Sequence, residues 1–189
     1  MERTQSDSAV LNEILMSFHC VQDSDIELFL HTRAVEFERL SKARTYLICD
    51  ENQFLEADFT LDKLIIYGYI ALAIKILSVP ETTSNRTRKE LDGLSAKIHG
   101  RVINDFPCFL IGQLARNSDV KKELLSGELL LEKAFNVIEV AVNAVGGRYI
   151  LIECLDNEKL IAFYQRNGFS EIARIPDENH QMVQMMRKF

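Results

Sequence analysis

Apolar side chains recur along the chain at the spacing of amphipathic helices in two long segments. Between Asp25 and Ser41 they fall on one face, which predicts one helix that begins at Asp25. A longer apolar stripe from Leu130 to Val145 predicts the strongest helix of the chain, and Gly146-Gly147 ends it.

Two weaker helical patterns follow the same logic. Residues 84–101 are polar and basic, with three apolar residues at helical spacing, which predicts a short, marginal helix. Asn157 to Arg166 predicts a short helix with Gly168 as its stop signal.

Six other segments are predicted to be strands. The first two are β-branched and aromatic, and the acidic stretch DENQFLEAD between them predicts an antiparallel hairpin. The middle two are almost continuously apolar, which is typical of central strands covered on both faces. The turn PDENH joins the last two. In chain order the strands are Thr45–Cys49, Leu64–Leu77, Phe106–Ala115, Arg148–Leu155, Phe169–Ile175 and Gln181–Arg187.

The order of these elements predicts an α+β fold. A strand, the strongest helix and a second strand form a βαβ unit, so the order is mixed α+β with one parallel crossover. At 189 residues, without a repeat or a linker-like stretch, the chain is expected to form one domain over residues 1–189.

Composition narrows the functional classes. The net charge of −6 argues against a broad basic surface for nucleic acid. The four cysteines are far apart, which indicates reduced, mostly buried thiols rather than a zinc site or disulfide framework. The chain shows no pattern of a secretory signal and no apolar run long enough to span a membrane, so we expect a cytoplasmic protein without a membrane partner.

Three segments together resemble the GNAT superfamily of acetyl-CoA-dependent acyltransferases. FPCFLIGQLARN (106–117) is similar to its central strand, and SGELLLEKA (126–134) to the start of its cofactor helix. DNEKLIAFYQRNGF (156–169) is the most specific, because Asn157 and Tyr164 stand seven residues apart ahead of Gly-Phe.

The resemblance implies a fold and a set of site residues. It implies an α/β/α sandwich: a mixed, mostly antiparallel, twisted sheet with helices on both faces and a cleft between two splayed central strands. The co-substrate is acetyl-CoA, without a metal. Tyr164 is the implied general acid, and it contacts the cofactor. The other implied cofactor-binding residues are Leu114, Ala115 and Arg116 for the pantetheine arm, Lys122, Leu125, Ser126 and Gly127 for the pyrophosphate, and Asn157.

The phosphate-binding loop departs from the family pattern. Family members carry Q/R-x-x-G-x-G/A, whereas here the segment 121–127 reads KKELLSG and keeps one glycine. A helix N-terminus still attracts anions, Ser126 is placed to cap it, and Lys121 and Lys122 add charge. A fold that has lost coenzyme A and serves as a non-catalytic binding module is the alternative.

The acceptor remains open between two classes. A primary amine on a small molecule or peptide is ranked first, because the net charge argues against RNA. Toxin-type acetylation of aminoacyl-tRNA is the alternative, and a homodimer is also left open. The tRNA alternative rests on a cluster of basic residues: Arg86, Arg88, Lys89, Lys97 and Arg101. The candidate general bases that could deprotonate the amine are His99, Asp105 and Glu153.

Overall fold

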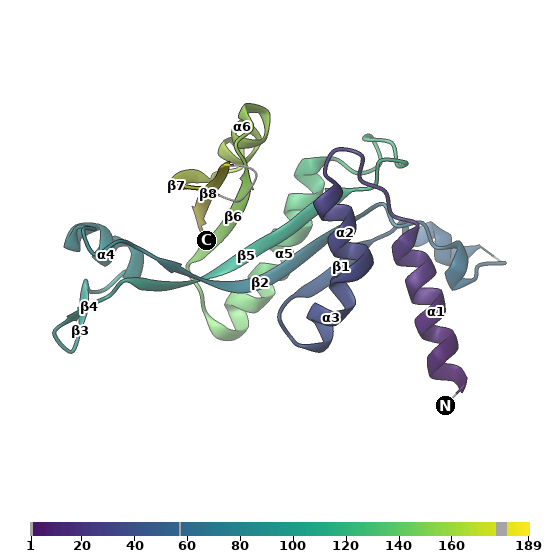
Figure 1. Ribbon diagram of the computed structural model, residues 1–189, viewed down its shortest axis with the longest axis horizontal. Helices are drawn as coiled ribbons and strands as arrows, with labels where there is room; N and C mark the ends of the chain where they lie inside the picture. Colours follow the sequence, from purple (N-terminus) through teal and green to yellow (C-terminus); the bar gives the residue numbers. More distant parts are fainter. Residues whose placement is uncertain (1, 57, 177–180) are drawn as a thin grey trace. The chain divides into compact units, whose positions relative to one another are not determined.

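The computed structural model describes residues 2–56, 58–176 and 181–189, and the chain divides into two compact units (Figure 1). The first unit consists of Met1–Ala73 and Ile111–Ala144, and the second of Ile74–Leu110 and Val145–Phe189. The two longest strands, β2 (Gly68–Ser78) and β5 (Asp105–Arg116), each contribute to both units.

A six-stranded sheet has the order β1-β2-β5-β6-β8-β7. The pairs β1/β2, β6/β8 and β7/β8 are antiparallel, while the helix α5 (Gly127–Val145) connects the neighbouring strands β5 and β6. This arrangement confirms the predicted α+β class and its mostly antiparallel sheet. The predicted turn PDENH spans residues 176–180, of which 177–180 lie outside the described residues. The remaining strands are β1 (Arg44–Ile48), β6 (Tyr149–Leu155), β7 (Ser170–Pro176) and β8 (Gln181–Lys188).

Helices cover both faces of the sheet in the first unit. Tyr69 and Ala71 of β2 belong to a buried cluster with residues of α1 (Glu2–Met16) and α2 (Ser24–Thr32). Side chains alternate between the faces of a strand, so Gly68 faces the opposite side, where the side chains of Leu125 and Leu130 approach it. The α5 helix therefore packs on the face opposite α1 and α2.

The predicted helix from Asp25 to Ser41 is wrong in two respects. It begins earlier, because the Asp23 carboxylate accepts from the backbone amides of Asp25 and Ile26, and it breaks at Arg33. The second part is the short helix α3 (Ala34–Arg39). The sequence analysis also missed α1, whose Ile14 and Leu15 are buried in the core of the first unit.

The connection between β1 and β2 is longer than a tight hairpin. Two 3-10 turns, η1 (Glu51–Leu55) and η2 (Leu61–Lys63), lie within it. The antiparallel pairing itself is confirmed, with Arg44 opposite Leu72 and Ile48 opposite Gly68.

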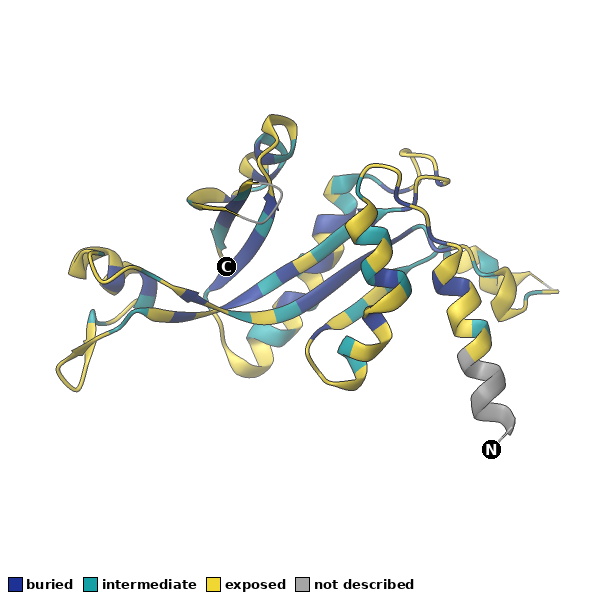
Figure 2. Cartoon of the chain, in the orientation of Figure 1, coloured by how far each residue is buried: buried dark blue, intermediate teal, exposed yellow. Residues whose placement is uncertain are grey.

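In the second unit, residues 84–101 form more than the predicted helix. The helix α4 (Asn85–Asp92) ends at Gly93, and a separate two-stranded hairpin follows, with β3 (Lys97–Ile98) paired to β4 (Arg101–Val102). A buried cluster joins Leu91 of α4 to Phe106 of β5 and to Tyr149 and Leu151 of β6. Figure 2 shows that the hairpin itself is exposed. The last helix, α6 (Glu158–Arg166), begins and ends as predicted.

Candidate active site

The first turn of α5 offers free backbone donors. The Ser126 hydroxyl oxygen accepts from the amide of Leu129 at 3.1 Å, and the Ser126 carbonyl accepts from the amide of Leu130 at 3.1 Å. Ser126 is therefore the N-cap, as its position in the sequence predicts. The amides of Gly127 and Glu128 have no hydrogen-bond partner among the described residues. Their N–H groups and the dipole of a 19-residue helix suit a phosphate.

Side chains shape the loop that lacks the usual glycines. Arg116, at the end of β5, donates to the carbonyls of Asn117 and Val120 and so braces the loop from inside. Asn117 is 3% exposed and anchors the loop to the segment just before β2, because its Nδ2 donates to the Ile66 carbonyl at 2.9 Å and its own amide donates to the Tyr67 carbonyl at 2.8 Å. Neither role was recognised in the sequence.

The predicted cofactor residues differ in what they can offer. Leu125 is 2% exposed, so its side chain belongs to the core and only its backbone can contact a cofactor. Ala115 is likewise buried, whereas Leu114 is half-buried. Lys122 is exposed and free to reach a phosphate.

The loop before α5 has no net positive charge that would attract an anion. Between residues 116 and 128 the three cations Arg116, Lys121 and Lys122 are balanced by three acids, Asp119, Glu123 and Glu128. The lysines therefore compensate for neighbouring carboxylates rather than creating a positive surface. Any grip on a pyrophosphate rests mainly on the aligned amides at the start of α5.

Replacing Ser126 by Ala is expected to destabilise the protein by about 1 kcal/mol, because the amide of Leu129 loses its acceptor. It should also weaken acetyl-CoA binding, since the amides of Gly127 and Glu128 are then held less firmly. Chemical denaturation and a titration with acetyl-CoA measure the two effects. Ser126→Asp restores a capping oxygen but adds a negative charge, so it should recover stability and not cofactor affinity.

Tyr164 lies in the second unit and is buried. The residue is 6% exposed, and its ring makes edge contacts with Phe163 and Phe169 at centroid distances of 5.1 and 5.7 Å. Its hydroxyl has no hydrogen-bond partner among the described residues. Burial, and to a lesser extent Cys154, raises the pKa of Tyr164 well above its ordinary value. The phenol therefore stays protonated at neutral pH, as a general acid requires.

Asn157 is the N-cap of α6. Its side-chain oxygen accepts from the amides of Lys159 at 3.0 Å and Leu160 at 3.2 Å. Only the Nδ2 group is left for a cofactor contact.

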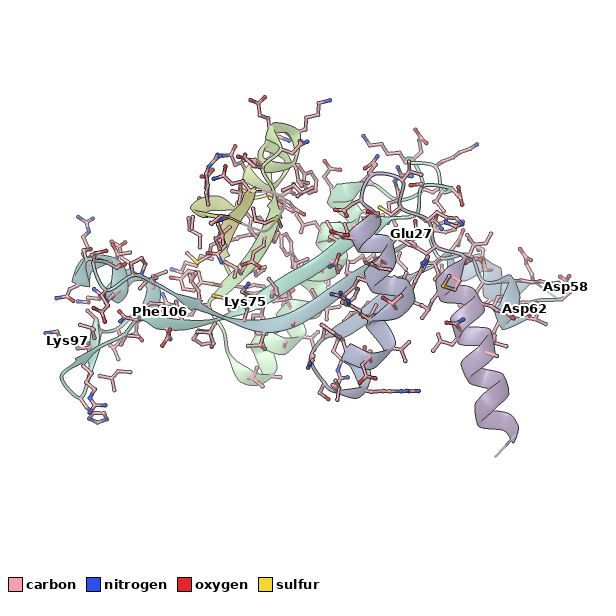
Figure 3. The ribbon with its side chains drawn as sticks, viewed as in Figure 1. Glu27, Asp58, Asp62, Lys75, Lys97 and Phe106 are labelled. Atoms are coloured by element: carbon pink, nitrogen blue, oxygen red, sulfur yellow. The ribbon has the colours of Figure 1, made fainter. Side chains whose placement is uncertain are left out.

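Two of the three candidate bases, Glu153 and Asp105, have partners in the second unit. Both carboxylate oxygens of Glu153 lie 2.6 Å from the Lys75 ammonium, and Gln184 donates to one of them at 2.8 Å (Figure 3 labels Lys75). The Glu153 carboxylate is therefore engaged by partners within the protein. Asp105 accepts from the Ser78 hydroxyl at 2.6 Å, whereas His99 is exposed at the hairpin turn.

The cysteines are unsuited to nucleophilic catalysis. Cys20, Cys108 and Cys154 are buried and Cys49 is partly buried, and all four are free thiols. Burial raises the pKa of the Cys154 thiol to about 11, with smaller contributions from Asp156 and Glu171. A thiol with this pKa is almost fully protonated at neutral pH and is a weak nucleophile.

Residues 2–56, 58–176 and 181–189 contain neither a membrane-spanning helix nor a cluster of metal ligands. No helix among them is both long and apolar enough to cross a membrane. No three of their His, Cys, Asp or Glu side chains come together as a metal site.

No protein-family model matches the chain, and no curated protein matches it. Solved structures do. The crystal structure of AtaTR bound with AcCoA is 25% identical, with a TM-score of 0.62, and the match covers 90% of this chain and 84% of that one. AtaT complexed with acetyl-methionyl-tRNAfMet is 23% identical, with a TM-score of 0.62 and coverage of 90% and 85%. A Tyr-to-Phe mutant of AtaT bound to the C-terminus of the antitoxin AtaR and acetyl-CoA is 22% identical, with a TM-score of 0.60 and coverage of 92% and 84%.

The protein has a GNAT fold. The resemblance to the GNAT superfamily that three sequence segments indicated is confirmed. The predicted acyltransferase class and its acetyl-CoA co-substrate are supported with it.

Proposed function

We propose that this protein transfers the acetyl group of acetyl-CoA to the α-amine of an aminoacyl-tRNA. The observation that carries the proposal is the match over 90% of the chain to AtaT in complex with acetyl-methionyl-tRNAfMet. The free amides of Gly127 and Glu128 at the capped start of α5 support the cofactor half of the reaction.

The first unit carries most of the groups proposed for the cofactor, and we propose that residues 1–189 act as one catalytic domain. The backbone of Leu114, Ala115 and Arg116 would hold the pantetheine arm. The amides from Leu125 to Glu128 would hold the pyrophosphate, with Lys122 as an exposed charge. These groups fit a diphosphate, because Gly127 and Glu128 present unpaired N–H groups and Gly127 has no side chain to obstruct them. In the second unit, the Asn157 Nδ2 group remains available as a donor.

Tyr164 would supply the proton that the reaction needs. Acetyl-CoA brings the acetyl group as a thioester. The amine nitrogen forms a bond to the carbonyl carbon, the carbon–sulfur bond breaks, and the departing sulfur takes the phenolic proton of Tyr164. The amine nitrogen loses one proton to solvent, and solvent later returns one proton to Tyr164. No covalent enzyme intermediate is required, which agrees with the buried, high-pKa thiols.

The test uses purified protein with acetyl-labelled acetyl-CoA and methionyl-tRNA. We expect label in acid-precipitable RNA, released when mild base hydrolyses the ester between amino acid and tRNA. Deacylated tRNA is the matched control, because it has the same phosphates but no α-amine. Label transferred to small amines and not to methionyl-tRNA would overturn this proposal in favour of the small-amine reading.

A thermal shift separates an enzyme from a non-catalytic module. Acetyl-CoA at 100 times its dissociation constant should stabilise the folded protein by about 2.7 kcal/mol. An unchanged unfolding curve at millimolar acetyl-CoA would contradict the cofactor site and favour the module.

A further inference from the structure

A basic surface stands out in the second unit of this acidic protein. We call residues 84–102, which comprise α4 and the β3/β4 hairpin, the basic arm. It carries five Lys and Arg residues against two acids, whereas the whole chain has a net charge of −6. The arm lies at the end of the β2 and β5 strands (Figure 1), and Lys97 lies at its outer part (Figure 3).

Two of the five cations are used by the protein itself. Arg88 is 3% exposed, and its guanidinium donates to the carbonyls of Pro80, Glu81 and Thr83 and to the Asn104 side chain. Arg86 forms an exposed ion pair with Glu90 at 3.2 Å. Arg88 is therefore structural, although the sequence placed it with the candidate binding residues.

The other three cations are available to a ligand. Lys89, Lys97 and Arg101 are exposed and form no ion pair among the described residues. Of the two acids in the arm, Glu90 is paired with Arg86, and Asp92 accepts from the amides of Leu94 and Ser95. No carboxylate of the arm neutralises the three cations.

The hairpin is a bare ribbon whose two faces are both exposed. Ile98 pairs with Arg101 and Lys97 pairs with Val102, so each face presents one cation and one aliphatic side chain. All four side chains are exposed, with Ile98 at 56% and Val102 at 45%. The turn holds His99 and Gly100 at φ values of 48° and 79°, as a two-residue primed turn requires. An isolated two-stranded hairpin is only marginally stable in water. Because Ile98 and Val102 are exposed, burial of its apolar side chains does not account for the presence of the hairpin.

The base of the arm is anchored. The Arg88 hydrogen bonds tie α4 to the residues that precede it and to Asn104. Leu91 is buried with Phe106 and Tyr149, and the Tyr149 hydroxyl donates to the Glu90 carbonyl at 3.0 Å. The exposed cations are thus presented on a fixed base rather than on a loose tail.

We propose that the basic arm binds the phosphate backbone of the tRNA substrate through Lys89, Lys97 and Arg101. This inference rests on the proposed function. The cations lie on a helix and on opposite faces of a ribbon, which suits a polyanion that carries a charge at every residue and extends past several surfaces. An acidic protein partner, by contrast, would cover one face of the ribbon and leave the other exposed.

The test compares two triple variants of the full chain. K89E/K97E/R101E removes the three available cations of the arm, and R39E/K133E/K188E reverses three exposed cations outside it. Each substitution changes the charge by two, so both variants move from −6 to −12. Fluorescence anisotropy with labelled methionyl-tRNA over a salt series gives the dissociation constant and its salt dependence.

We expect the arm variant to bind tRNA at least about tenfold more weakly at low salt than the control variant. The logarithm of the association constant falls linearly with the logarithm of the salt concentration, and the magnitude of this slope should decrease by about 2 to 3 because three phosphate contacts are lost. Unfolding curves and acetyl-CoA affinity should match those of the wild type in both variants. The same weakening in both variants would mean that only net charge matters and would overturn the inference.

The inference and the proposed function fail in different ways. Wild-type tRNA affinity and salt slope in the arm variant would overturn the inference, while label transfer to methionyl-tRNA would still support the function. If the arm variant binds tRNA normally but no longer binds an acidic protein, the arm serves that partner instead. Arm-dependent tRNA binding without acetyl transfer would support the arm and contradict the enzymatic role.

Discussion

Replacing Tyr164 by Phe is expected to slow acetyl transfer by about 100-fold or more, while acetyl-CoA binds as tightly as before. The phenol of Tyr164 is the proposed proton donor to the departing sulfur. Phenylalanine keeps the aromatic ring and lacks only the hydroxyl group that carries this proton. The substitution is clean because the Tyr164 hydroxyl has no hydrogen-bond partner among the described residues, so none is left unsatisfied. The ring contacts with Phe163 and Phe169 remain.

Single-turnover kinetics with acetyl-CoA and methionyl-tRNA measure this effect, and chemical denaturation provides the control. The free energy of unfolding should stay within about 0.5 kcal/mol of the wild-type value. Because burial raises the pKa of Tyr164, the wild-type rate should show no loss from tyrosine ionisation below about pH 10. An unchanged rate in Tyr164→Phe would remove Tyr164 from the mechanism.

Replacing Gly68 by Ala is expected to destabilise the protein by about 1–3 kcal/mol and to weaken acetyl-CoA binding. A Cβ at this position would lie 2.6 Å from the Leu125 Cδ2 and 2.7 Å from the Ala115 carbonyl oxygen. The second contact is with backbone, which cannot rotate away. Leu125 directly precedes the cap of α5, so its displacement should move the amides proposed for the pyrophosphate.

Gly146→Ala is the matched control, because it makes the same chemical change without crowding. A Cβ there meets nothing within 4 Å, although the residue has a φ of 80°, so the variant is strained by its backbone alone. Both variants should melt at lower temperature, by about 2–4 °C for each kcal/mol. Only Gly68→Ala should lose acetyl-CoA affinity in a titration, and equal affinities would contradict the role given to the Gly68 contact.

Local patterns in the sequence predicted most elements because they reflect local forces. The apolar stripe of α5 ends at Gly146 and Gly147, whose φ values of 80° and 140° favour glycine. Ser126 and Asn157 cap the helices that follow them, because a cap needs only the next three residues.

The errors occur where local signals were weak or ambiguous. Nothing between Asp25 and Ser41 marks the break at Arg33, and the break keeps Phe29 and Phe37 in contact, with ring centroids 5.4 Å apart. The hairpin after α4 turns on His99-Gly100, which lacks the usual Asn-Gly or Asp-Gly signal.

The sequence by itself determined most of the element types, the helix caps and the family likeness, because each depends on residues a few positions apart. The tertiary structure decided which side chains are free to act. It turned Leu125 and Arg88 into structural residues, and it paired Glu153 with Lys75 across 78 positions of the chain. Burial and ion pairing arise from segments that meet only in the folded chain, so no local pattern can carry them.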